Sequence, residues 1–157
     1  MINTFLKRVL DLIIAFSCLI LLLPVYGVIS LLIYFEDKGR IFFIQERRGK
    51  NGLTFNLIKF RSMSEDSENS GSGLYSFDND PRVTQIGKFI RKTSLDELPQ
   101  LVNVIRGQMS IVGPRPPVTY ELGSWEDYTQ DMLLRFSVKP GITGLAQVLG
   151  RNENNWD

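Results

Sequence analysis

The sequence predicts an α+β fold in which helices dominate, with a broken apolar helix at the N-terminus and a small mixed domain after it. Three observations support this prediction. The stretch from residue 12 to residue 35 contains no charged side chain. Two short runs, 41–44 and 53–60, have the composition of β-strands. From residue 84 onward, apolar residues recur at helical spacing.

Charge and composition exclude several classes of protein. The net charge is +1, so the chain as a whole offers no electrostatic reason to bind nucleic acid. Histidine is absent, which excludes Ser-His and Cys-His nucleophile pairs and histidine-ligated zinc. The single cysteine, Cys18, lies inside the apolar block and has no partner for an internal disulfide. Any catalysis must use carboxylates, hydroxyls, Lys, Arg or a metal held by oxygen atoms.

Pro24 lies at the middle of the apolar block. A straight helix over 12–35 would be roughly 36 Å long, enough for a hydrocarbon core of about 30 Å. A proline inside a helix removes one hydrogen bond and clashes with the preceding turn. Basic residues flank the block on both sides, with Lys7 and Arg8 before it and Lys38 and Arg40 after it, so the positive-inside rule favours neither orientation. Two alternatives remain, a kinked span and a re-entrant hairpin whose ends share one side of the membrane.

The rest of the chain divides into short elements. The strands 41–44 and 53–60 flank a turn at 49–52, and the polar stretch at about 64–80 is predicted to be a mobile loop. One helix is predicted from Thr84, and a second one ends at Arg106-Gly107. The proline-rich segment 113–117 must be extended and stiff. The stretch 121–136 has the pattern of an amphipathic helix, and its aromatic residues would suit a membrane interface.

The segment 93–100 contains the adjacent acids Asp96 and Glu97. In the plainer interpretation Ser94 and Glu97 form an S-x-x-E capping box, a purely structural motif. In the functional interpretation the acids lie at a helix N-terminus that also holds a phosphate. One acid would then attack phosphorus, and the other would help to hold a divalent cation.

Phosphate chemistry also requires positive charge close to the acids. The candidates that we single out are Lys59 at the end of the second strand, Arg91 in the helix that follows Thr84, and Arg115 between prolines. Arg115 is the strongest of the three, because a rigid backbone presents the guanidinium group at a small entropic cost. A basic residue at the surface is more often only a solvated charge.

Several motifs in one order resemble a known family. They are Asp80–Thr84, Ser94–Leu101, Asn103–Gly107 and Met109–Pro116, together with Lys7, Arg8 and Asp11, Lys59–Met63 and Lys139–Gly144. The chain is similar over almost its whole length to the bacterial sugar transferases, which are also called monotopic phosphoglycosyl transferases. One such motif alone is weak, but this many in one order are specific.

The resemblance implies transfer of a sugar-1-phosphate from a UDP-sugar to undecaprenyl phosphate, giving undecaprenyl-diphospho-sugar and UMP. It implies that Asp96 is the nucleophile, forming an aspartyl phospho-sugar intermediate, and that Glu97 assists through Mg²⁺, the expected cofactor. Both acids are therefore candidate metal ligands, and Arg115, with Lys59 and Arg91, would bind phosphate.

The resemblance also favours the re-entrant alternative for the apolar block. We expect residues 1–36 to form a re-entrant membrane helix that breaks at Pro24, and residues 37–157 to form a catalytic domain. That domain would lie on the cytoplasmic face of the bacterial inner membrane, in contact with its lipid.

Three features depart from the family pattern. Leu23 precedes the proline where Ser is common, Gln108 stands where an acid is usual, and the chain stops at Asp157 where family members continue. We therefore expect a C-terminally truncated chain. The rival hypotheses are an inactive membrane-anchored scaffold and a Mg²⁺-dependent phosphatase or nucleotide-sugar hydrolase. The motifs specify neither the sugar nor the oligomeric state.

Overall fold

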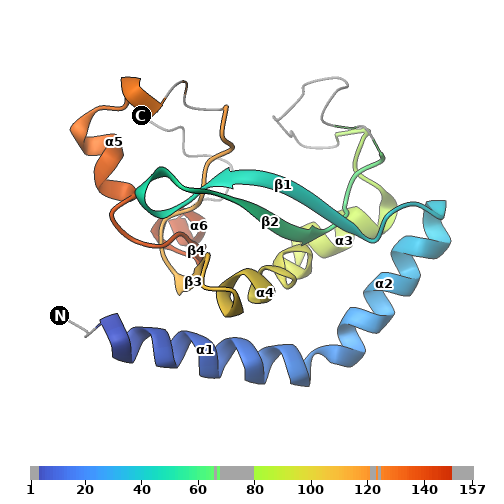
Figure 1. Ribbon diagram of the computed structural model, residues 1–157. Helices are drawn as coiled ribbons and strands as arrows, with labels where there is room; N and C mark the ends of the chain where they lie inside the picture. Colours follow the sequence, from blue (N-terminus) through green and yellow to red (C-terminus); the bar gives the residue numbers. More distant parts are fainter. Residues whose placement is uncertain (1–3, 66, 68–79, 121–122, 124, 150–157) are drawn as a thin grey trace. The chain divides into compact units, whose positions relative to one another are not determined.

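The computed structural model describes residues 4–65, 67, 80–120, 123 and 125–149 (Figure 1). Contacts divide the chain into two compact units. The first unit contains the described residues of 1–21, 44–58 and 100–157, and the second contains those of 22–43 and 59–99. The predicted segments 1–36 and 37–157 were defined by composition and follow a different division. Most of the predicted loop at 64–80 lies outside the described residues.

The apolar block forms two helices, α1 (Thr4–Leu21) and α2 (Leu23–Asp37). The break is at Leu22, and Pro24 lies in the first turn of α2, where a missing N–H removes no intrahelical hydrogen bond. Among the described helices, none alone is both long enough and apolar enough to cross a bilayer. The two together meet that test only as a pair bent by 60°.

The hairpin predicted at 41–60 is confirmed, with a longer first strand. Strand β1 (Phe42–Arg48) and strand β2 (Thr54–Phe60) form a two-stranded sheet, joined by the 3₁₀ turn η1 (Lys50–Gly52). The turn requires a left-handed backbone at Asn51 (φ 56°) and Gly52 (φ 77°), and Asn and Gly adopt that conformation at little cost.

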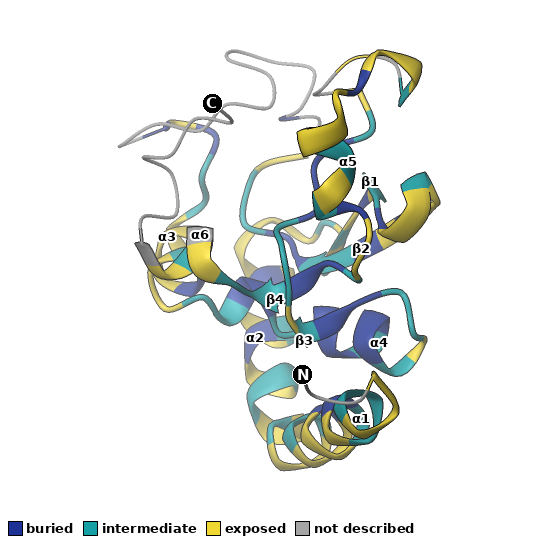
Figure 2. Ribbon diagram, turned by 90° about the vertical axis from the view of Figure 1, so that its left-hand side faces the viewer, coloured by how far each residue is buried: buried dark blue, intermediate teal, exposed yellow. Residues whose placement is uncertain are grey.

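The core of the first unit lies between α1, β2 and α4 (Gln100–Ile105), and α1 and α4 lie side by side in Figures 1 and 2. Its centre is an apolar cluster, formed by Ala15, Phe55, Leu57, Leu101, Val104 and Met109.

Asn103 of α4 is fully buried at the edge of this cluster. Its side-chain amide donates to the Asn56 carbonyl (2.7 Å) and to Gln108 Oε1 (2.7 Å), and its Oδ1 accepts from the Ile58 amide (3.1 Å). Asn103 therefore ties α4 to β2. Gln108 supplies Asn103 with an acceptor oxygen.

Helix α1 turns its polar side toward the protein. Asp11 is buried and accepts hydrogen bonds from Ser110 Oγ (2.8 Å), the Ile111 amide (3.1 Å) and Lys7 Nζ (3.2 Å). The outer side is apolar and appears yellow in Figure 2. A helix on a water-exposed surface has the opposite arrangement. The exposed large apolar residues of α1 are Phe5, Leu6, Leu10, Ile13, Ile14, Phe16, Ile20 and Leu21.

A second sheet in this unit was not predicted. Strand β3 (Ser110–Val112) pairs in parallel with β4 (Gly141–Thr143), with Ser110 opposite Gly141. The backbones come so close beside this pair that a Cβ on Gly141 would lie 2.0 Å from the Gly113 nitrogen. Strands of three residues are too short to show a sequence period, so the sequence did not predict this contact.

The single amphipathic helix predicted over 121–136 is wrong. Within the described part of that stretch, the 3₁₀ turn η4 (Trp125–Asp127) is separated from the helix α5 (Gln130–Arg135). Thr129 starts α5 as an N-cap, because its side chain accepts a hydrogen bond from the Met132 amide (3.3 Å). One further short helix, α6 (Leu145–Leu149), follows β4.

The aromatic residues of that stretch pack on one another and do not form an outward face. The ring centres of Trp125, Tyr128 and Phe136 are 5.1 to 5.6 Å apart, and Tyr128 and Phe136 are buried. The guanidinium of Arg48 lies over the Trp125 ring, 5.3 Å from its centre. These rings therefore pack together within the first unit.

The second unit is built on α2 and α3 (Gln85–Lys92) around a core of Ile29, Ile33, Phe60 and Ile90. The helix predicted from Thr84 is confirmed, with Thr84 Oγ1 accepting from the Gly87 amide (2.9 Å). Helices and two small sheets together confirm the α+β, helix-dominated class.

Candidate functional site

Asp96 and Glu97 lie in the 3₁₀ turn η3 (Leu95–Glu97), which follows α3 in the second unit. Ser94, before the turn, has a left-handed backbone (φ 63°) and makes no side-chain capping bond. The predicted capping box is therefore wrong. The turn closes through backbone bonds, including one from the Glu97 amide to the Ser94 carbonyl (3.2 Å).

The turn is held on both sides of the two acids. Leu95 and Leu98 pack against the core of the second unit. Tyr26 of α2 donates its hydroxyl proton to the Leu98 carbonyl (2.6 Å), and its ring lies 5.3 Å from that of Phe60. Helix α2, the second half of the apolar block, therefore helps to hold the backbone of the turn that carries Asp96 and Glu97.

Both acids are buried, with 8% of Asp96 and 7% of Glu97 exposed. Glu97 Oε1 forms an ion pair with Lys59 Nζ at 3.3 Å, in which the side chains are 10% and 16% exposed. A buried carboxylate requires a compensating charge or hydrogen bonds. The structure therefore places four predicted residues, Lys59, Arg91, Asp96 and Glu97, in one unit and brings two of them, Lys59 and Glu97, into direct contact.

A second buried ion pair lies in the same unit. Asp80 accepts from Arg82 through Nη2 (2.7 Å) and Nε (3.0 Å), and Arg82 Nη1 donates to the Ser67 carbonyl (2.8 Å). The Arg82 hydrogen bonds lower the pKa of Asp80 to about 2 against the opposing effect of burial, and the charge of Arg91 adds to the lowering. Arg91, a predicted phosphate ligand, therefore lies where its charge acts on Asp80.

Replacing Asp80 by Asn is expected to lower the free energy of unfolding at pH 7, because Arg82 would lose the ionised carboxylate that accepts its hydrogen bonds. The pKa of Asp80 in the folded protein lies below the ordinary value of 3.8, so the pair stabilises fully above that value and progressively less as the pH falls toward about 2. Melting temperatures of the wild type and of the Asp80→Asn variant, measured from pH 7 to pH 2, test this pH dependence.

The difference between wild type and variant should narrow below about pH 4. Asp131→Asn, at an exposed position on α5, is the matched control and should melt like wild type. A difference in melting that stayed constant down to pH 2 would show that the ionised Asp80 is not what stabilises the fold.

Arg115 lies in the first unit, in a segment whose backbone is held at every residue. Four successive carbonyls accept hydrogen bonds: that of Pro114 from the Gly141 amide (3.0 Å), that of Arg115 from Arg135 Nη2 (2.8 Å), that of Pro116 from Arg47 Nη1 (3.1 Å) and that of Pro117 from the Arg48 amide (3.0 Å). These hydrogen bonds hold the backbone around Arg115 in place; the predicted stiffness stays a prediction.

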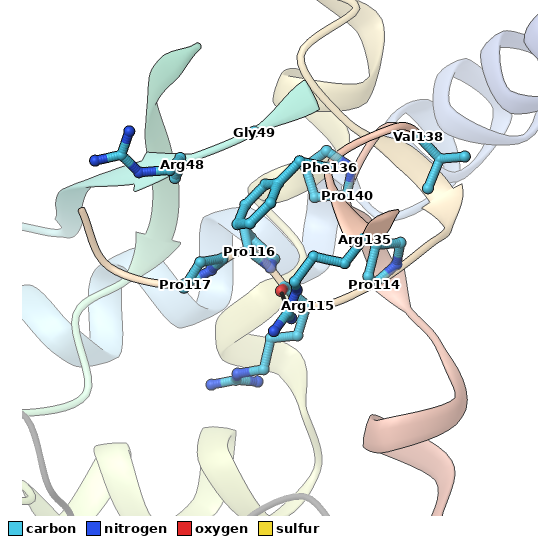
Figure 3. A pocket seen from close by; sticks show the side chains of 10 residues that line it. All are labelled: Arg48, Gly49, Pro114, Arg115, Pro116, Pro117, Arg135, Phe136, Val138 and Pro140. Atoms are coloured by element: carbon cyan, nitrogen blue, oxygen red, sulfur yellow. Dashed lines mark hydrogen bonds between the residues drawn. The ribbon is translucent and has the colours of Figure 1, made fainter. Parts of the chain in front are cut away.

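The same segment lines a pocket with about 170 Å³ of empty space, part of it open solvent (Figure 3). Arg135 and Arg115 line it, whereas the guanidinium of Arg48 points away from them.

The acid pair fits Mg²⁺ by its chemistry. Within the part of the chain that the structure describes, no group of three or more His, Cys, Asp or Glu side chains is arranged to hold a metal. Mg²⁺ usually binds through one or two carboxylates together with substrate phosphates and water. Asp96 and Glu97 supply two such carboxylates, one of them already paired with Lys59.

Sequence reasoning missed three structural contacts around these residues: the Asp80–Arg82 pair, the Tyr26 bond to the Leu98 carbonyl, and the Lys59–Glu97 ion pair. The first had a signal, because Asp80-Pro81-Arg82 was part of a recognised motif. The other two join residues distant in sequence, so only the fold could bring them together.

In the second unit a buried acid pair lies beside a lysine, and in the first unit an arginine stands on a fixed backbone; each is a group that phosphate chemistry uses. The chain matches the family model described as "Bacterial sugar transferase" over residues 2–157. It belongs to this family.

Relatives with given functions are similar over most of this chain. "UDP-galactose-lipid carrier transferase" of Erwinia amylovora is 46% identical over 169 residues, covering 99% of this chain and 35% of the relative. "UDP-glucose:undecaprenyl-phosphate glucose-1-phosphate transferase" of Klebsiella pneumoniae is 46% identical over 149 residues, covering 95% and 32%. "Exopolysaccharide production protein ExoY" of Sinorhizobium fredii is 44% identical over 161 residues, covering 94% and 70%. The chain thus spans about a third of the first two relatives.

Proposed function

We propose that this protein transfers a sugar-1-phosphate from a UDP-sugar to undecaprenyl phosphate, as the first membrane step of glycoconjugate synthesis. The observation that carries the proposal is the buried pair Asp96 and Glu97, held in a fixed turn with Lys59 beside it. Names of relatives support the same class of reaction, and they make UDP-glucose and UDP-galactose the first donors to test.

In the first step, a carboxylate oxygen of Asp96 attacks the phosphorus that bears the sugar. An Asp96–phosphorus bond forms, the bond from that phosphorus to the UMP oxygen breaks, and UMP leaves with the electron pair. In the second step, a phosphate oxygen of undecaprenyl phosphate attacks the same phosphorus and releases the Asp96 carboxylate. Each step exchanges one phosphorus–oxygen bond for another, so no further reactant is needed.

Positive charge must offset the repulsion between Asp96 and a diphosphate. Lys59 neutralises Glu97 at 3.3 Å and so reduces the negative charge next to the nucleophile. Arg91 and Arg115 are proposed to bind phosphate oxygens, with Arg115 favoured by its fixed backbone. Mg²⁺ bound by the two carboxylates would stabilise charge on the diphosphate.

We further propose that α1 and α2 enter and leave the inner membrane from the cytoplasmic side. The apolar outer side of α1 supports lipid contact, and the break at Leu22 supports a return to the same leaflet. Nucleotide sugars are cytoplasmic, which requires the acid pair to lie on that side.

Single cysteines introduced as Thr4→Cys and Glu46→Cys, each in a Cys18→Ala background, test this topology. Both positions are exposed in the structure. Both variants should be protected from a membrane-impermeant thiol reagent in intact cells and labelled after permeabilisation. Labelling of the Thr4→Cys variant alone in intact cells would establish a span.

The transfer itself is tested with radiolabelled UDP-glucose or UDP-galactose and undecaprenyl phosphate in detergent. We expect label in the lipid phase and UMP in equal amount. UMP or sugar phosphate released without the lipid acceptor, at an undiminished rate, would identify a hydrolase. No label in lipid with any UDP-sugar would support a scaffold.

A further inference from the structure

Lys139 carries a positive charge that the described part of the chain does not neutralise. It is half-buried, and its ammonium group forms no hydrogen bond or ion pair with a described residue. It lies close to a second cation: a Cβ on Gly107 would be 3.7 Å from Lys139 Nζ and 3.6 Å from Arg8 Nη2. Both cations therefore border the space left open by the missing side chain of Gly107.

The surroundings of Lys139 are positive overall. Burial is the first cause that lowers its pKa, and the charges of Arg8, Lys50 and Lys7 lower it further. Asp11 is the one carboxylate that opposes them. It already accepts bonds from Ser110, Ile111 and Lys7 on the inner side of α1. An excess of positive charge in a partly desolvated place favours a bound anion.

Arg8 is fixed in place and still has donors to offer. Its Nη1 donates to the Val104 carbonyl (2.7 Å) and its Nη2 to the Ile105 carbonyl (3.0 Å), at the C-terminal end of α4. A guanidinium group has five N–H donors, so these two bonds fix its position and leave other N–H groups able to bind a ligand. Gly107 has a left-handed backbone (φ 81°), which suits a glycine at this helix end.

We propose that Arg8, Lys139 and the open space at Gly107 form a binding site for the headgroup phosphate of an anionic membrane phospholipid. A lipid is favoured because Arg8 belongs to α1, whose outer side is a continuous apolar surface that begins at Phe5 and Leu6. Lys and Arg side chains near such a surface bind anionic headgroups.

This site holds its ligand and does not react with it. Among the described residues, the carboxylate whose charge acts on Lys139 is that of Asp11, and it is buried and bonded within the protein, so it does not serve as a nucleophile toward the phosphate. The proposal goes beyond the transfer reaction, because it assigns a role to the Lys7-Arg8 and Lys139-Pro140-Gly141 motifs, which that reaction leaves unused. Its test requires no turnover, so it succeeds or fails independently of the proposed activity.

The test is native mass spectrometry of the full chain in neutral dodecyl maltoside micelles, titrated with phosphatidylglycerol or phosphatidylcholine. Wild type should retain one phosphatidylglycerol at concentrations where it retains no phosphatidylcholine. Lys139→Gln should weaken that retention about fivefold, the loss expected for one basic residue near an anionic lipid. Its melting temperature should not fall, because Lys139 has no bonded partner to lose among the described residues.

Lys88→Gln is the matched control, since it makes the same charge change at an exposed position on α3 and should retain phosphatidylglycerol like wild type. Equal retention by wild type and Lys139→Gln would overturn the proposal, as would equal binding of phosphatidylcholine. Displacement of the bound lipid by equimolar polyprenyl phosphate would assign the site to the acceptor. Displacement by equimolar inorganic phosphate would reduce it to a simple anion site.

Discussion

The Asp96→Asn variant is expected to fold, to stay in the membrane fraction and to lose sugar-phosphate transfer by at least about 10⁴-fold. The amide has the size of the carboxylate but is not a nucleophile, and both bond exchanges proposed here go through this side chain. Removing a charge from a side chain that is only 8% exposed should not unfold the protein. The rate of label transfer from UDP-sugar to lipid measures the effect.

Asp127→Asn makes the same chemical change at an exposed position in η4 and should leave transfer unchanged. Melting temperatures of both variants must be measured with the rates, so that a loss of fold is not read as a loss of chemistry. Near-normal transfer by Asp96→Asn would remove Asp96 from the mechanism and leave it a structural residue of the turn.

Chelation should have the second largest effect. EDTA is expected to lower transfer by at least about 100-fold, and added Mg²⁺ or Mn²⁺ should restore it. The reason is that a diphosphate must approach two adjacent carboxylates, and a divalent cation bound there would offset the repulsion. The same lipid-phase assay, run over a series of Mg²⁺ concentrations, measures the dependence.

Glu97→Gln should raise the Mg²⁺ concentration that gives half-maximal transfer, because one of the two proposed ligands loses its charge. The Asp127→Asn protein should show the wild-type dependence on Mg²⁺. Undiminished transfer in EDTA would mean that the basic residues suffice and that Glu97 has been assigned the wrong role.

The elements that sequence predicted well are those whose signals are local. The hairpin turn at 49–52 needs residues that accept a left-handed backbone, and Asn51 and Gly52 supply them. The helix from Thr84 begins with a hydroxyl cap. In each case a few adjacent residues determine the local structure.

The predictions that failed, and the contact that was missed, concern places where the local sequence pattern did not determine the backbone. Ser94 looked like a helix cap, but the chain adopts a left-handed turn there. The stretch 121–136 had a helical period, but Trp125, Tyr128 and Phe136 pack on one another across a break in the helix. The pairing of β3 with β4 joins segments about thirty residues apart, and no local pattern encodes it.

The same limit applies to the candidate site. The motif identified Asp96 and Glu97, since they are adjacent in sequence. It did not identify which charge would face them, because Lys59 comes from a strand 38 residues away from Glu97. The hydrogen bond from Tyr26 to the Leu98 carbonyl could not be predicted either, because 72 residues separate the two along the chain.

Mass spectrometry of the protein incubated with UDP-glucose or UDP-galactose, without any lipid acceptor, tests the covalent mechanism most directly. We predict a mass increase of one hexose phosphate on the peptide that contains Asp96, one UMP released per modified protein, and loss of the modification when undecaprenyl phosphate is added. The Asp96→Asn protein should remain unmodified. An unmodified wild-type protein that nevertheless transfers sugar phosphate to lipid when both substrates are present would contradict the account.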